Sequence, residues 1–200
     1  YPDGLREIDI WNYYQKVKGP LLQQVINRDL MFFLMVDVNK DIVLRRGVGA
    51  RFLRLNNKNY DTLITGRTVS IHSTMKSHET FGIIDIDIDD FDEAKLATLK
   101  VYNTMTKTYN TSIRFSGKNS FHVICGFGSE RNIDSIRLGL ENHLKSIGLN
   151  KDYTIGYKRT RGIPNLDLSP NKLRGGFITL HSLSTIGLKC MEVDPGRIIR

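Results

Sequence analysis

An α+β fold with a largely antiparallel sheet is the fold class that this sequence predicts. Short runs rich in β-branched and aromatic residues recur from residue 30 onward, which is typical of strands. Two longer stretches, residues 90–109 and 133–147, carry apolar residues at helical spacing. The strands and helices follow one another in mixed order, as they do in α+β folds.

The composition is that of a folded, basic protein. Hydrophobic residues make up 40% of the 200 residues, enough for a substantial core, and we expect a single domain over residues 1–200. Lys and Arg number 29 against 21 Asp and Glu, which gives a net charge of +8. That excess favours a polyanionic partner such as nucleic acid.

Several classes are not supported by the sequence. It contains no run of about 18 apolar residues and no basic start followed by an apolar stretch, so we expect neither a membrane span nor a secretory signal. Cys125 and Cys190 stand alone, which predicts no zinc site and no disulfide framework and fits a reducing, cytoplasmic location. Because the chain begins with Tyr1, we expect a fragment of a longer protein.

The first third of the chain predicts helices followed by strands. Residues 6–29 are expected to form two helices separated at Gly19 and Pro20, since proline breaks a helix interior. Five short β-type runs follow, bounded by Asn, Lys, Asp and Gly: residues 30–36, 41–45, 51–55, 61–66 and 67–73.

The segment FGIIDIDIDDFDEAK, residues 81–95, alternates isoleucine with aspartate and then enters a helix. In a strand, Ile84 and Ile86 would share one face while Asp85 and Asp87 share the other. Carboxylates on one face repel unless a cation lies between them, because they are only ~6–7 Å apart along the backbone. A divalent metal held by Asp85 and Asp87 is one reading, and an acidic face in water is the other.

The predicted helix at residues 90–109 has Leu96, Leu99 and Met105 at helical spacing, and the helix at 133–147 is closed by Gly148. Further strands are expected at residues 112–116, 121–127, 165–169, 176–182 and 186–193.

The segment SGKNSFH places phosphate-binding groups close together. Ser116, Gly117 and Lys118 form a turn that offers a hydroxyl, backbone amides and a cation. His122 follows in a strand, facing away from Phe121. The alternative is an ordinary hairpin turn with a surface lysine and a structural histidine.

A third carboxylate, Asp167, alternates with leucines in a strand-like run, and Arg174 and His181 follow it around a Gly-Gly pair. Three carboxylates brought together by strands could hold two divalent ions about 3.5–4 Å apart, the arrangement that catalyses phosphoryl substitution.

In their order and spacing, DIDIDDFDEAK, SGKNSFHV and LDLS…RGGFITLHS…IGL resemble the three motifs of the archaeo-eukaryotic primase superfamily, DxD, SxH and hydrophobic-Asp. The early segments WNYYQKV, INRDL and TVSIHS are similar to the polymerase domain of bacterial end-joining DNA ligases. The chain departs from the end-joining enzymes, which usually carry a proline soon after DxD. The resemblance implies a primase-polymerase core with an RRM-like antiparallel sheet flanked by helices.

The resemblance also implies site residues and cofactors. Asp85, Asp87 and Asp167 would hold two Mg²⁺ or Mn²⁺ ions, without zinc. Ser116, Gly117, Lys118 and His122 would bind the incoming triphosphate, and His72, Arg174 and His181 would line the nucleotide pocket.

The implied function is template-directed addition of nucleotides to a 3′-hydroxyl, with a DNA template and primer and an NTP or dNTP as partners. A helicase, a ligase or an accessory primase subunit or domain is a further expected partner. Gap filling at DNA breaks is the alternative, although the acidic motif and RGGFITLHS favour priming. A metal-dependent nuclease would not need the triphosphate groups of SGKNSFH, and a non-catalytic nucleic-acid-binding module would not need all three acids.

Overall fold

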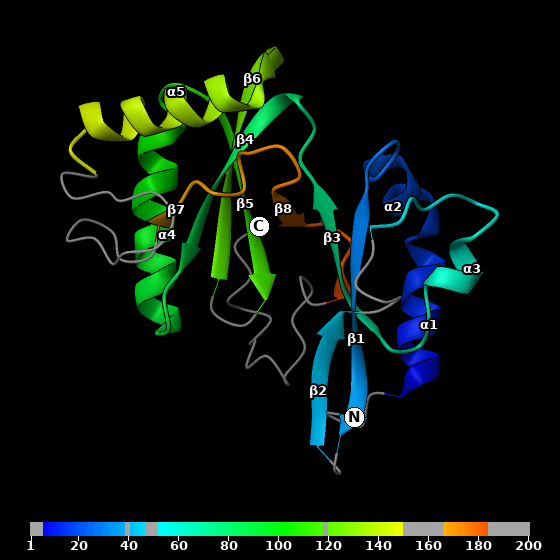
Figure 1. Ribbon diagram of the computed structural model, residues 1–200. Coiled ribbons are helices and arrows are strands. Elements are labelled where there is room, and N and C mark those ends of the chain that lie inside the picture. Colours follow the sequence, from blue (N-terminus) through cyan, green and yellow to red (C-terminus); the bar gives the residue numbers. More distant parts are fainter. Residues whose placement is uncertain (1–5, 39–40, 47–51, 118–119, 150–165, 184–200) are drawn as a thin grey trace. The chain divides into compact units, whose positions relative to one another are not determined.

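The computed structural model describes residues 6–38, 41–46, 52–117, 120–149 and 166–183 (Figure 1). Their contacts form two compact units. The first comprises the described residues up to Thr74 together with those from Gly176 onward, and the second comprises those from Met75 to Gly175. The expectation of a single domain over residues 1–200 stays a prediction. None of the described helices is long and apolar enough to cross a bilayer.

The first unit is a four-stranded antiparallel sheet with three helices. Its strands follow the order β2-β1-β3-β8, and Leu30 on β1 forms an additional bridge with Leu53. The apolar faces of the helices and the sheet share one core that includes Tyr14 and Tyr60. The elements are α1 (Glu7–Lys16), α2 (Lys18–Gln24), β1 (Leu30–Val38), β2 (Asp41–Arg46), α3 (Tyr60–Leu63), β3 (Thr68–Thr74) and β8 (Gly176–Ile178).

The predicted helix break at Gly19 and Pro20 is wrong by two residues. The break falls at Val17, and α2 includes both residues. Pro20 lies in the first turn, where a backbone N–H has no partner within the helix, so its missing N–H costs nothing. The first bond of the helix, from the N–H of Leu21 to the carbonyl of Val17 at 2.9 Å, comes directly after it.

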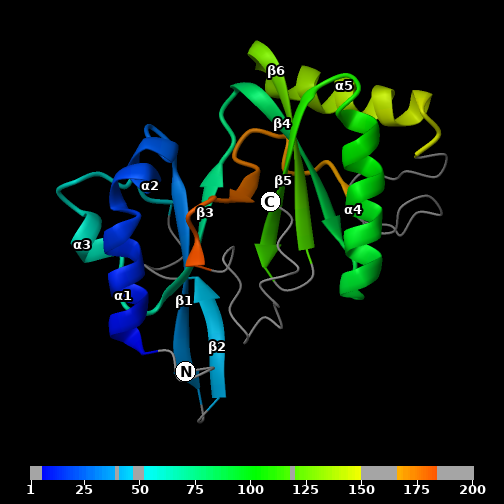
Figure 2. The same cartoon turned by 180° about the vertical axis from the view of Figure 1, so that it is seen from behind.

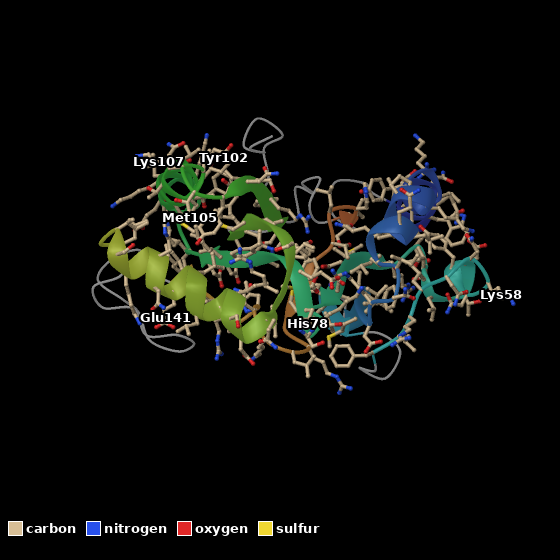
Figure 3. The ribbon with its side chains drawn as sticks, turned by 90° about the horizontal axis from the view of Figure 1, so that it is seen from above. Lys58, His78, Tyr102, Met105, Lys107 and Glu141 are labelled. Atoms are coloured by element: carbon tan, nitrogen blue, oxygen red, sulfur yellow. The ribbon has the colours of Figure 1, made fainter. Side chains whose placement is uncertain are left out.

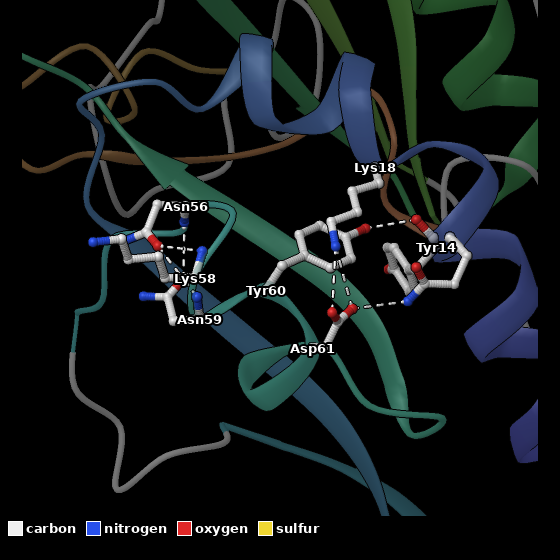
Figure 4. A network of polar contacts seen from close by, with 8 residues as sticks. Tyr14, Lys18, Asn56, Lys58, Asn59, Tyr60 and Asp61 are labelled. Carbon is white, nitrogen blue, oxygen red and sulfur yellow. Dashed lines mark hydrogen bonds and ion pairs between the residues drawn. The ribbon is translucent and has the colours of Figure 1, made fainter.

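The strand predicted at residues 61–66 is instead the short helix α3 (Figure 4). Tertiary contacts to α1 and α2 explain the difference. The Tyr60 ring is fully buried and its hydroxyl donates to the Tyr14 carbonyl at 2.6 Å, while Lys18 lies 3.3 Å from the Asp61 carboxylate and 4.6 Å from the Tyr60 ring centre. These contacts outweigh a local β-propensity worth at most ~1 kcal/mol. Of the run predicted at 51–55, the described part contributes only the bridge at Leu53.

The second unit has the order β-α-β-β-α-β and the sheet order β5-β6-β4-β7, the arrangement of a ferredoxin-like split βαβ domain. All its ladders are antiparallel. This confirms the predicted fold class, a mainly antiparallel sheet flanked by helices. The elements are β4 (His78–Asp87), α4 (Phe91–Met105), β5 (Asn110–Gly117), β6 (Ser120–Asn132), α5 (Ile133–Ser146) and β7 (Leu166–Asp167).

Both helices of this unit pack on one face of its sheet, beside β4, β5 and β6 in the two opposite views (Figures 1 and 2). Phe91 of α4 contacts the rings of Phe115 and Phe121, and a Cβ on Gly82 of β4 would lie 2.6–2.7 Å from Ile136 and Leu140 of α5. Gly82 therefore lets α5 approach the sheet closely. The opposite face is the one that carries the aspartates of β4.

The helix ends follow from local chemistry. Asp90 accepts from the N–H of Glu93 at 2.8 Å and so caps α4, and Asn132 caps α5 in the same way through the N–H of Asp134 at 2.9 Å. The α5 prediction is confirmed, with Gly148 in the left-handed region after its end. In Figure 3, Met105 marks the buried C-terminal end of α4 and Glu141 marks α5.

The predicted apolar face of α4 is corrected at Leu96, which is 69% exposed. The face that packs on the sheet carries Phe91, Ala94, Thr98, Val101 and Met105 instead. Small residues on that face allow the helix backbone to lie near the strands. The strand predicted at 186–193 lies outside the described residues.

Candidate functional site

Four polar side chains form a row across the second sheet, on the face opposite its two helices. Asp85 on β4 lies opposite Asp167 on β7 and opposite His122 on β6, and His122 lies opposite Arg114 on β5. Directly opposite residues in antiparallel strands point to the same face, with Cα atoms ~4.5–5.5 Å apart. We call Arg114, His122, Asp85 and Asp167 the polar row. It brings together one residue from each of the three sequence motifs.

Asp85 is oriented by contacts from β6. The Nε2 atom of His122 lies 3.3 Å from its Oδ1, and the Ser120 hydroxyl donates to the same oxygen at 3.2 Å. His122 is only 6% exposed, and its Nδ1 is buried and makes no hydrogen bond within the described part of the chain. One imidazole nitrogen therefore holds the carboxylate, and the other remains available for a further polar group.

A second row of opposed residues lies two residues further along β4. Asp87 on β4 is opposite Ser120, and Ser120 is opposite Gly117 at the end of β5. The register of β5 against β6 shifts between Phe115 and Gly117, so Ser116 lies at a β-bulge. Bulges re-aim side chains and are frequent next to active sites.

The predicted alternation holds here, since Ile84 and Ile86 are fully buried and Asp87 is exposed. Lys118 lies outside the described residues.

Asp167 is held by its own turn. The N–H of Ser169 donates to its Oδ1 at 2.7 Å, and the Ser169 hydroxyl donates to Oδ2. Among the described residues the strand that carries Asp167 covers Leu166–Asp167 and ends before the predicted residue 169, because the chain turns at Ser169 and continues with a proline that has no N–H to offer a ladder.

The residues of the row fit a divalent metal in donor chemistry but not in their present orientation. Carboxylate oxygens suit Mg²⁺ and Mn²⁺. Within the described ranges, however, no group of three or more His, Cys, Asp or Glu side chains could hold a metal ion. The carboxylate of Asp85 points to Ser120 and His122, and that of Asp167 points to Ser169. The backbones of Asp85 and Asp167 are directly opposed, which places the two side chains on the same face of the sheet.

The sequence predictions omitted four residues of this region. Arg114 is part of the row, and burial lowers the pKa of its guanidinium to about 10 because desolvation disfavours the charged form. Its place in the alternating run SIRFS was the available signal. Ser120 and Ser169 orient carboxylates, and their signals were the spacings SxH and DxS. Asn171 binds the backbone of β4, and the sequence held no signal for it.

The remaining predicted residues are divided between the two units. Arg174 belongs to the second unit, is exposed, has a φ of 61° and donates its N–H to the Met75 carbonyl at 3.2 Å. His72 and His181 belong to the first unit. His72 sits on β3 with its ring centre 4.7 Å from that of Phe33, and the His181 carbonyl accepts from the Tyr13 hydroxyl at 3.1 Å.

A buried serine fixes the backbone next to His72. The N–H of Ile71 donates to the Ser182 hydroxyl at 2.8 Å, and that hydroxyl lies 3.0 Å from the Ile71 carbonyl. Ser182 therefore continues the pairing between β3 and β8 after the regular ladder has ended at Ile178, which is earlier than the predicted 176–182.

No protein-family model matches this chain, and no curated protein matches it. A solved structure of the polymerase domain from Mycobacterium tuberculosis Ligase D in complex with DNA has a similar fold. The TM-score is 0.61, with 88% of this chain and 76% of that chain covered, and the sequence identity is 10%. At this identity the likeness concerns the fold.

Proposed function

We propose that this chain is a template-directed nucleotidyltransferase of the primase-polymerase kind. The observation that carries the proposal is the polar row: Asp85, His122 and Asp167 come from three separate motifs and lie opposite one another on adjacent strands. The fold shared with a polymerase domain supports the same reading.

In this proposal Asp85, Asp87 and Asp167 hold two divalent ions, Mg²⁺ or Mn²⁺. Ions held there would supply Lewis-acid chemistry: a lower pKa for the attacking hydroxyl and charge neutralisation on the leaving phosphates. The row supports this because it places Asp85 and Asp167 directly opposite each other on adjacent strands.

The triphosphate is bound by the groups next to the carboxylates. His122 donates from its buried imidazole to a phosphate oxygen, and Ser116, Gly117 and Lys118 contribute a hydroxyl, backbone amides and an ammonium group. We propose nucleotide-binding roles for His72, Arg174 and His181 as well. Template and primer bind through the excess of cations, which accounts for the net charge of +8.

Priming on a single-stranded DNA template is the activity that we favour, and gap filling at DNA breaks is the second candidate. The second candidate has one specific observation in its favour, the fold shared with the polymerase domain of an end-joining ligase. The two activities differ in substrate: gap filling requires a primer terminus and a 5′-phosphate across the gap, whereas priming requires neither.

The test is a nucleotide-incorporation assay on single-stranded and gapped templates, with labelled nucleotide and Mg²⁺ or Mn²⁺, with and without primer. We expect products on the unprimed template. Asp85→Ala should abolish them, while Asp92→Asn, which changes an exposed aspartate in the first turn of α4, should not. Products only on gapped DNA carrying a 5′-phosphate would select gap filling. Incorporation that persists in Asp85→Ala, or none on any template, would reject the proposal.

A further inference from the structure

Asn171 lies at the edge of β4 and takes the place of a strand. Its side chain is fully buried. The N–H of Ile83 donates to its Oδ1 at 2.7 Å, and its Nδ2 donates to the Ile83 carbonyl at 2.5 Å and to the Leu168 carbonyl at 3.1 Å. One amide side chain thus binds both backbone groups of a β4 residue, as a neighbouring strand residue would.

The described backbone ladder at this edge is short. Among the described residues, β7 pairs with β4 at two positions, Leu166 with Ile86 and Asp167 with Asp85. A slip of one residue would turn Asp167 to the other face of the sheet. The contact of Asn171 with Ile83, two residues before Asp85, continues the antiparallel alignment past the turn and disfavours such a slip.

The turn itself presents Asn171 in a fixed position. The Asn171 N–H donates to the Leu168 carbonyl at 3.0 Å, and further along the turn Met75 and Gly175 are joined by a backbone hydrogen bond of 2.7 Å. The chain from Asp167 to Gly175 is therefore bonded to β4 at Asp85 and Ile83, and to the segment before β4 at Met75.

We propose that Asn171 is a positioning residue that keeps Asp167 opposite Asp85, so that both carboxylates can reach one divalent ion. The binding of a divalent ion rests on the proposed function, whereas the alignment of Asp167 with Asp85 does not. An asparagine is suited to this position because a carboxamide both donates and accepts. An aspartate would lose both donated bonds and add a buried charge.

The test compares three variants of the whole chain by Mn²⁺ titration and by amide hydrogen exchange. Asn171→Ala removes the clamp, Asn171→Asp keeps only the acceptor, and Leu144→Ala is the matched control, a fully buried α5 residue on the helix-covered face. Titrations are run well below each unfolding temperature. Substituting a group that orients a metal ligand typically lowers metal affinity 10–100-fold.

We expect both Asn171 variants to bind Mn²⁺ at least tenfold more weakly than the wild type, and Leu144→Ala to match the wild type. Exchange should accelerate at the β4–β7 pairing in the Asn171 variants only. Equal Mn²⁺ affinity in Asn171→Ala and Leu144→Ala would overturn the positioning role.

Failure of the proposed function has a different signature. If the wild type does not bind Mn²⁺, or if Asp85→Asn binds it equally well, the metal role of the row is wrong. Exchange then decides the inference alone: faster exchange at β4–β7 in Asn171→Ala upholds the alignment role, and unchanged exchange rejects it.

Discussion

Substitution by alanine should destabilise the protein at one of two adjacent glycines and have little effect at the other. A Cβ on Gly175 would lie 2.0 Å from the Pro170 carbonyl oxygen and 2.9 Å from that of Lys172, closer than the 3.0 Å that real Cβ atoms respect. A Cβ on Gly176 would meet nothing within 4 Å. We therefore expect Gly175→Ala to open the turn that carries Asp167, and Gly176→Ala to leave it unchanged.

The magnitude follows from the bonds that the turn would lose. Moving Gly175 away breaks its N–H bond to Lys172 and the bond from the Met75 N–H to its carbonyl, both 2.7 Å long. Each is worth ~0.5–1.5 kcal/mol. Overpacking in a closed environment adds ~1–3 kcal/mol. The free energy of unfolding should fall by ~2–6 kcal/mol in Gly175→Ala and change by less than ~0.5 kcal/mol in Gly176→Ala.

Urea denaturation of the two variants and the wild type measures the difference. A loss of this size lowers the midpoint by ~1–3 M at a slope of ~2 kcal/mol per molar urea. Mn²⁺ binding should weaken in Gly175→Ala as well, because the same turn presents Asp167. Equal midpoints for Gly175→Ala and Gly176→Ala would show that the turn is not closed around Gly175.

Three further predictions concern other parts of the molecule. Gly139 lies in the middle of α5, and a new Cβ there would meet nothing within 4 Å. Gly139→Ala should therefore stabilise the fold by ~0.5–1 kcal/mol in urea denaturation, and a loss of stability would contradict these open surroundings. Burial raises the pKa of Cys125 and of Tyr13 to about 12 each. Because the unfolded groups release their protons at lower pH, the free energy of unfolding should fall as pH rises from about 9 to 12. Urea midpoints measured under reducing conditions at rising pH check this, and a rising midpoint would reject the sign. His122→Ala and Lys118→Ala should weaken nucleotide binding by titration while leaving non-specific DNA binding nearly unchanged, and the reverse pattern would assign these groups to the template.

The sequence predicted the parts of the site that depend on local periodicity. Alternation in residues 81–89 assigned Asp85 and Asp87 to one face and Ile84 and Ile86 to the other, and the structure confirms both. Helical spacing likewise located α5, because its apolar residues repeat at the period of the helix whatever the rest of the chain does.

Pairing between strands could not be predicted in the same way. Which residue lies opposite Asp85 depends on how two distant strands align, and neither strand carries that information in its own periodicity. The motif order suggested that Asp167 belongs to the same site, but only the register places it directly across from Asp85. The same limit explains α3, where burial of Tyr60 between other elements outweighed a strand-like local sequence.

The residues that orient the site lie where sequence patterns are least informative. The segment SPNKLRGG has no periodicity and reads as a loop, yet Asn171 is fully buried in it and Gly175 has no room for a Cβ. A polar side chain in a loop is normally exposed, so nothing local separates Asn171 from its exposed neighbour Lys172. The distinction comes from the edge of β4, which leaves the backbone groups of Ile83 to be bonded by whatever lies beside them. The strand that ends at Asp167 and the turn that follows it therefore place Asp167 on the ladder and the side chain that bonds the edge of β4 in the loop.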